Sequence, residues 1–256
     1  GWETDALGAD YECFLSQFLP ALVAFLQKKG VDQKTFFHIS DEPHGKHLEH
    51  YLACKNLVAG YIGDLPLIDA MSDYAFYESG VMQKPIPVIY HADPFLAHNV
   101  PGLWVYYNGS TTGTYHITGR MIAQRLCDTR ALGFQLWQNR IEGFLHWGFN
   151  FWNSQDSYHH LDPFLNTDAD YFMPSGDAFL VYPGDDGDCW ESLRLNAMRE
   201  AMEDLRMLSL CESLRGRDFT EALLRETAGE PVTFRTLPRE DFYGILREKI
   251  AAAIEE

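Results

Sequence analysis

Two adjacent carboxylates are the residues of this sequence best suited to chemistry. Asp41 and Glu42 stand between Ser40 and Pro43, directly after a short apolar stretch, residues 35–40, that predicts a buried strand. At the carboxyl end of a barrel strand, where active sites gather, they share a partly desolvated space. One carboxyl group then stays protonated beside an ionised neighbour, as glycoside cleavage requires. Alternatively, Asp41 caps the next helix and Glu42 lies in its first turn.

Histidines lie on both sides of the acidic pair. His38 alternates with apolar residues in the predicted strand and is a candidate substrate-binding residue, although a hydrogen-bonded core histidine is an alternative interpretation. After the pair, His44, His47 and His50 recur every third residue. A metal site is one interpretation, but HExxH is absent and repeated steps of three drift around a helix. The sequence therefore favours solvated or substrate-edge histidines and predicts no metal ligands.

Aromatic and amide side chains end two further predicted strands. The candidates for substrate binding are Tyr107 and Asn108 after the first strand, and Trp147, Asn150 and Trp152 after the second. If both are barrel strands, their ends meet at the mouth that holds the acidic pair and offer ring-stacking surfaces with polar contacts. Alternatively, about half of these side chains are core residues, because alternate strand residues point outward to the helices.

The elements that must position these residues alternate between helix and strand. Helices are predicted over residues 11–29, 45–61, 74–79, 118–139 and 192–214, the last with Leu193 and Leu208 on its apolar side. Strands or short apolar runs are predicted over residues 35–40, 67–70, 86–91, 103–107 and 143–147. Residues 154–187 predict a long functional loop with an extended segment at 179–182. The alternation favours an α/β fold with a parallel sheet, either a barrel or an open sheet.

Composition and charge exclude several classes of protein. The chain has 256 residues, of which 46% are hydrophobic and 14% aromatic, and this excludes disorder, collagen-like repeats and a small disulfide scaffold. A net charge of −17 without any Lys/Arg block argues against a nucleic-acid partner. No stretch approaches about 18 uninterrupted apolar residues, so no membrane span is predicted. The sequence carries no signal for the oligomeric state.

Five widely spaced cysteines bear on the compartment. They form no CxxC pair and no metal-ligand spacing, which predicts free, mostly buried thiols in a reducing, cytoplasmic environment. The polar, acidic start does not resemble a secretory signal. If an N-terminal part is missing, a secreted or periplasmic location is the alternative.

Several phrases, in this order, resemble glycoside hydrolase family 123 and the related DUF4091 catalytic-domain proteins. The phrases are residues 36–43, 68–70, 72–74, 105–109, 130–133, 143–147, 182–184, 192–195 and 199–204. Together the resemblance covers most of residues 11–214. It implies a retaining β-N-acetylgalactosaminidase on a (β/α) barrel, with the substrate's own acetamido group as nucleophile. A substrate-assisted enzyme needs no second carboxylate across the sugar, which makes chemical sense of two adjacent acids.

The resemblance also implies roles for individual residues. Glu42 is the general acid and base, and Asp41 orients the 2-acetamido group and stabilises the developing oxazolinium charge. Tyr107 donates its hydroxyl to the acetamide carbonyl, and Trp147 forms the floor under the sugar ring. No metal or organic cofactor is implied.

The chain departs from the family in its strands. Members carry the first barrel strands ahead of the helix that opens this sequence, and only about five strands of barrel type are found where eight are needed. We therefore expect residues 1–190 to form a TIM-like (β/α)8 barrel that lacks its first strands, and residues 191–256 to form helices packed on it. The predicted function is hydrolysis of terminal β-linked N-acetylhexosamine, with N-acetylgalactosamine favoured. The alternatives are a non-catalytic carbohydrate-binding module and a metal-dependent hydrolase that uses the histidine face.

Overall fold

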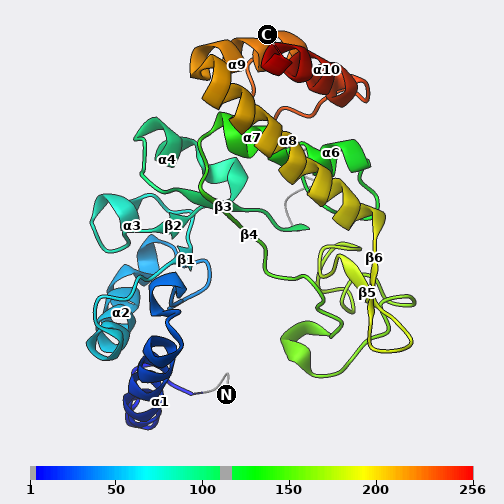
Figure 1. The fold of residues 1–256 in the computed structure, drawn as a ribbon. Helices are drawn as coiled ribbons and strands as arrows, with labels where there is room; N and C mark the ends of the chain where they lie inside the picture. Colours follow the sequence, from blue (N-terminus) through cyan, green and yellow to red (C-terminus); the bar gives the residue numbers. More distant parts are fainter. Residues whose placement is uncertain (1–3, 110–116, 256) are drawn as a thin grey trace. The chain divides into compact units, whose positions relative to one another are not determined.

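The chain forms two compact units, residues 1–105 and 106–256, in a computed structural model that describes residues 4–109 and 117–255 (Figure 1). Each unit has its own hydrophobic core. Helices and strands mix in both, so the predicted α/β class is confirmed. None of the described helices is long and apolar enough to cross a membrane.

The first unit begins with two packed helices and continues into short parallel strands. Its helices and strands are α1 (Ala9–Lys29), α2 (Leu48–Ile62), β1 (Asp69–Ala70), α3 (Ala75–Glu78), β2 (Pro85–Ile86) and α4 (Asp93–Ala97). α1 and α2 meet through a cluster that includes Leu15, Leu19 and Ile62. α1 ends where Gly30 adopts a left-handed φ of 67° and donates its N–H to the Gln27 carbonyl.

Three extended segments of this unit run parallel to one another. Phe37 pairs with Leu67 in the segment that leads into β1, and β1 pairs with β2 in the register Asp69 to Pro85. The Met71 N–H continues this ladder to the Ile86 carbonyl at 2.9 Å. Parallel strands bring their carboxyl ends to the same edge, which is where the acidic pair follows the first segment.

The second unit is mostly helical. Its described elements after β3 (Trp104–Tyr106), which crosses the division between the units, are α6 (Leu126–Arg130), α7 (Leu132–Gln138), β4 (Gly143–Leu145), β5 (Val181–Pro183), β6 (Cys189–Glu191), α8 (Leu193–Arg215), α9 (Arg217–Ala228) and α10 (Phe242–Glu255). Figure 1 shows α8 as a long helix that passes α6, α7 and α10. Phe134, Leu208 and Leu246 belong to the core that these helices share. β5 and β6 form an antiparallel pair.

Most of the predicted helices are confirmed, but three predicted elements are wrong in extent. The strand predicted over 35–40 is reduced to a single parallel bridge at Phe37, because the backbone leaves the ladder after that residue. The strand predicted over 86–91 ends at Ile86, and a 3-10 turn occupies Ile89–His91. The helix predicted over 118–139 is two short helices that begin only at Leu126. The earlier residues form other contacts: the Arg120 guanidinium donates to the carbonyls of Asp177 and Gly148. Such contacts hold the chain in a non-helical path.

Two predictions about burial are also wrong. Leu193 is 69% exposed, because the buried face of α8 passes instead through Arg194 and Asp204, which have ionic or hydrogen-bonding partners. The five cysteines are free, but Cys13 and Cys189 are exposed and, of the five, only Cys211 is fully buried. Each sheet found in the described residues has two strands, so closure into a barrel stays a prediction.

Candidate active site

The acidic pair lies on a bend at the carboxyl end of the parallel strands. The Glu42 N–H donates to the carbonyl of Ala70, the last residue of β1, at 3.0 Å. Glu42 has a φ of 44°, in the left-handed region that a residue other than glycine adopts at a cost of about 1 kcal/mol or more. Seven other described residues besides glycine also have a positive φ, so this backbone conformation draws attention to Glu42 only together with its place at the end of the parallel segments.

The capping interpretation of the acidic pair is wrong. The next helical turn begins at Gly45, and its N-cap residue is His44. Asp41 therefore lies three residues before the cap, and Glu42 lies outside the first turn. Both carboxylate side chains are exposed, so neither occupies the partly desolvated space that the sequence suggested.

The buried carboxylate beside this segment is Asp69, which sequence reasoning missed. Its Oδ1 accepts hydrogen bonds from the N–H groups of Ile39 at 2.8 Å and Ser40 at 3.1 Å. Its Oδ2 accepts the Tyr51 hydroxyl at 2.5 Å. Burial raises the pKa of Asp69, while these hydrogen bonds act to lower it. The sequence signals were an aspartate inside an otherwise apolar run, residues 67–70, and the family resemblance of residues 68–70.

His38 is a partner of the same carboxylate. Its Nε2 lies 3.3 Å from Asp69 Oδ1, and its side chain is 48% exposed. His38 therefore links the buried Asp69 to the surface beside the acidic pair, and it is not enclosed in the core.

The three histidines after the pair, His44, His47 and His50, are exposed. The rings of His44 and His47 meet edge to face at 4.3 Å between centroids. The N–H of Gly45 donates to Asp73 Oδ2 at 2.8 Å, which ties this turn to the segment after β1. Within residues 4–109 and 117–255, no group of three or more His, Cys, Asp or Glu side chains could hold a metal ion.

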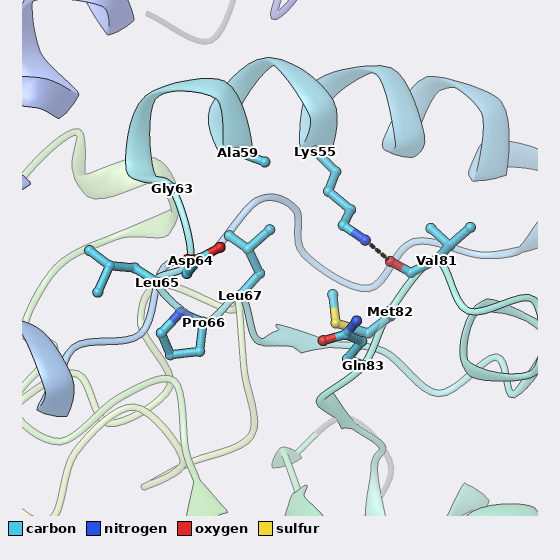
Figure 2. A pocket seen from close by; sticks show the side chains of 10 residues that line it. All are labelled: Lys55, Ala59, Gly63, Asp64, Leu65, Pro66, Leu67, Val81, Met82 and Gln83. Carbon is cyan, nitrogen blue, oxygen red and sulfur yellow. Dashed lines mark hydrogen bonds between the residues drawn. The ribbon is translucent and has the colours of Figure 1, made fainter.

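A pocket of about 310 Å³ lies at the opposite ends of these strands (Figure 2). It is lined by residues that precede β1, such as Leu65 and Leu67, and by residues that precede β2, such as Met82. Figure 2 shows the ammonium group of Lys55 bonded to the Val81 carbonyl at its edge. Because catalytic groups in parallel α/β folds gather at the carboxyl ends of strands, we do not assign the substrate to this pocket.

In the second unit, Asp177 joins two of the residues that end β4. His146 Nε2 lies 3.1 Å from Asp177 Oδ1, and the Trp147 indole N–H donates to Oδ2 at 2.8 Å. Burial lowers the pKa of His146, although the hydrogen bond to Asp177 acts to raise it. Burial acts to raise the pKa of Asp177, but the hydrogen bonds from His146, Trp147 and the Gly109 N–H hold it below its usual value. Sequence reasoning missed both His146 and Asp177.

The aromatic candidates differ in exposure. Trp147 is 36% exposed, and its edge contacts Phe151 and Phe172. Tyr107 is fully buried, its ring packs on Phe144 at 5.0 Å, and its hydroxyl lies 3.6 Å from the Met198 sulfur. Burial raises the pKa of Tyr107. Trp147 is thus available for stacking, whereas Tyr107 belongs to a packed interior.

The remaining candidates occupy the loop after β4 and the end of β3. Trp152 is half-buried and donates its indole N–H to the Val181 carbonyl at 3.1 Å. Asn150 is exposed and pairs through its backbone with Phe179, and Asn108 is half-buried. His38, Asp41 and Glu42 belong to the first unit and the other candidates to the second. That all of them form one mouth stays a prediction.

The family is decided by comparison with known proteins. A model of the glycoside hydrolase 123 catalytic domain matches residues 2–211. The chain belongs to glycoside hydrolase family 123. Among curated protein sequences, none matches this chain.

A solved structure from family 123 is similar in fold. It is a glycoside hydrolase from Clostridium perfringens, described as showing the details of glycolipid glycan hydrolysis. The TM-score is 0.63 and the sequence identity 17%, over 97% of this chain and 44% of that chain. The likeness at this identity concerns the fold alone, and this family 123 chain spans less than half the length of that relative.

Proposed function

We propose that this protein hydrolyses terminal β-linked N-acetylhexosamine, with N-acetylgalactosamine favoured, and retains the anomeric configuration. The observation that carries the proposal is a pair of adjacent carboxylates, Asp41 and Glu42, on a left-handed bend at the carboxyl end of parallel strands in a chain of family 123. That is the edge where α/β folds place catalytic groups.

The proposed mechanism divides two tasks between the two acids. Glu42 donates a proton to the leaving oxygen while the carbonyl oxygen of the substrate's acetamido group attacks the anomeric carbon and displaces it. Asp41 accepts a hydrogen bond from the acetamido N–H and balances the positive charge of the oxazolinium ion. Glu42 then takes a proton from the water that opens this ring, which restores both acids.

We further propose that the chain contributes strands to a TIM-like barrel and that Trp147 forms the floor under the sugar ring. The three parallel segments of the first unit support the barrel, and the exposed indole held by Asp177 supports the floor. The proposed role of Tyr107 requires its hydroxyl to exchange the weak contact with the Met198 sulfur for the acetamide carbonyl.

Hydrolysis of an aryl β-N-acetylgalactosaminide tests the proposal. We expect Glu42→Gln to lower kcat by roughly 100-fold or more, and Asp41→Asn to lower it as well. Glu49→Gln removes an exposed carboxylate from α2 and serves as the matched control, with kcat unchanged. The proposed mechanism is wrong if an aryl β-galactoside without the acetamido group is cleaved equally well, and the assignment of Glu42 is wrong if Glu42→Gln keeps full activity.

A non-catalytic carbohydrate-binding module is the second candidate. The exposed Trp147 favours it, because a fixed, accessible indole binds a sugar ring without any acid. This candidate predicts saturable binding of N-acetylgalactosamine that is lost in Trp147→Ala, with no turnover. Turnover that depends on Glu42 would exclude it.

A further inference from the structure

One buried carboxylate is hydrogen-bonded to the segment that carries the acidic pair. Asp69 has no exposed surface, and it contacts three consecutive residues, His38, Ile39 and Ser40, immediately before Asp41. We propose that Asp69 is a positioning residue that fixes the backbone of residues 38–40 and so sets the direction in which Asp41 and Glu42 present their carboxyl groups. The proposal rests on the proposed function of that pair.

The hydrogen bonds of Asp69 show why the first extended segment turns where it does. In a regular strand the N–H groups of successive residues point to opposite sides. Here a single oxygen, Asp69 Oδ1, accepts both the Ile39 N–H and the Ser40 N–H. The two N–H groups therefore converge on one side, and the backbone leaves the parallel ladder at this point. Asp69 takes the place of the backbone carbonyl that a continuing strand would have used.

The other oxygen of this carboxylate has a separate partner. Tyr51, on α2, donates its hydroxyl to Asp69 Oδ2 at 2.5 Å, and its ring is held edge to face against Phe76 at 5.4 Å. Tyr51, Asp69 and Phe76 are all buried, so the Tyr51 side chain cannot change rotamer without leaving a cavity.

The acidic pair is thus held from both sides. Asp69 fixes the residues before it, and the hydrogen bond from the Glu42 N–H to the Ala70 carbonyl fixes its end. Both anchors come from β1, in adjacent residues. The left-handed φ of Glu42 persists only because its surroundings enforce it. Since a displacement of about 1 Å costs as much as 100-fold in rate, loss of one anchor affects turnover more than binding.

The experiment compares Asp69→Asn with Tyr51→Phe and Asp64→Asn. Asp69→Asn keeps the size of the side chain but has an NH2 donor in place of one acceptor oxygen, so a single oxygen is left for the Tyr51 hydroxyl and the two backbone N–H groups. Tyr51→Phe removes only the donor to Oδ2 and leaves both backbone contacts. Asp64→Asn neutralises an exposed aspartate shortly before β1 and is the matched control. The readouts are kcat and KM on an aryl β-N-acetylgalactosaminide, and amide-resolved hydrogen exchange across the first unit.

We expect Asp69→Asn to lower kcat by roughly 10- to 100-fold with KM within about threefold. Its amides at Ile39 and Ser40 should exchange at least about tenfold faster, while those of α1 and α2 stay protected. Tyr51→Phe should lose no more than about threefold in kcat, and Asp64→Asn should match the wild type.

Three results would overturn the positioning role. They are an Asp69→Asn variant with wild-type kcat, faster exchange spread over the whole unit, and a Tyr51→Phe variant as impaired as Asp69→Asn. If the wild-type protein shows no turnover at all, the proposed function is wrong, and exchange still decides the anchoring. Faster exchange confined to Ile39 and Ser40 supports the anchor, and unchanged exchange overturns it.

Discussion

Gly133 lies where the backbone of α8 leaves no room for a side chain on α7, and Gly133→Ala is therefore expected to destabilise the second unit. A Cβ atom at this position lies 1.9 Å from the carbonyl oxygen of Ala201 and 2.7 Å from its carbon. In an unobstructed helix the same change stabilises by up to about 1 kcal/mol, because alanine has the higher helix propensity. The helix contact reverses that sign.

The magnitude follows from the distance. Real Cβ contacts do not fall below 3.0 Å, so the two backbones must separate by about 1.1 Å. The obstructing atoms belong to the backbone of α8 and cannot rotate away as a side chain would. Overpacking of this kind costs about 3 kcal/mol, which leaves a net loss of about 2 kcal/mol or more after the gain in helix propensity. For a protein of this size that corresponds to a fall in Tm of roughly 4–8 °C or more.

Thermal and urea unfolding followed by circular dichroism measure this loss. The matched control is Gly244→Ala on α10, where no atom lies within 4 Å of the added Cβ and the glycine is exposed. That variant should keep or raise the Tm. A Gly133→Ala protein that melts at or above the wild-type temperature would refute the close approach of α7 and α8.

Two further predictions concern buried titratable groups of the second unit. The Asp204 side chain is 1% exposed and accepts hydrogen bonds from Arg130 at 2.6 and 2.9 Å and from Arg247 at 2.7 Å. Asp204→Ala leaves both arginines without this partner and should lower the free energy of unfolding, measured in urea, by about 3 kcal/mol. A loss below about 1 kcal/mol would contradict this prediction. The unfolded chain protonates His146 near its ordinary pKa of 6.5, whereas burial lowers the pKa of His146 in the folded chain. The free energy of unfolding should therefore fall as the pH drops below about 6.5, and it should fall less in His146→Gln. Equal slopes of unfolding free energy against pH in the wild type and the variant would show the reasoning to be wrong.

Helix ends could be predicted because their signals are local. The Lys28, Lys29 and Gly30 run ends α1, and Gly30 takes the left-handed conformation that glycine allows. At the other end of the chain, Ser192 caps α8 by accepting the Leu195 N–H at 3.2 Å. Residues within one turn of each other decide both features, so sequence spacing is sufficient.

The region before α6 shows where such reasoning ends. Its apolar periodicity predicted helix from residue 118, but Arg120 binds carbonyls 28 and 57 residues further along the chain. The Ile122 N–H is taken by the Ser175 carbonyl at 2.9 Å. Helix propensity is a preference of at most about 1 kcal/mol per ordinary residue, and tertiary hydrogen bonds override it. Periodicity carries no information about such distant partners.

In the candidate site, too, features set by neighbouring residues could be predicted and features set by distant residues could not. Asp41 and Glu42 could be located because a strand-like run and two acids are neighbours in sequence. The left-handed backbone of Glu42 could not be predicted, because left-handed positions are usually signalled by glycine or asparagine and this residue is neither. The role of Asp69 could not be predicted either, because its contacts with Ile39 and Ser40 lie 30 and 29 residues away in the sequence. The burial that the sequence argument assigned to the acidic pair belongs to this neighbouring carboxylate.

Six of the phrases that resemble family 123 contact one another in three pairs. Residues 68–70 contribute Asp69, which binds the phrase 36–43. Residues 143–147 contribute Phe144 and His146, which pack on Tyr107 of the phrase 105–109.

The third pair, residues 130–133 with residues 199–204, joins Arg130 to Asp204 and brings Gly133 against Ala201. That pair carries no candidate catalytic group, so its side chains serve helix packing. Each of these phrases therefore marks a contact within the fold. Residues 36–43 also leave two exposed acids at the carboxyl end of the parallel segments, which is where we propose the chemistry.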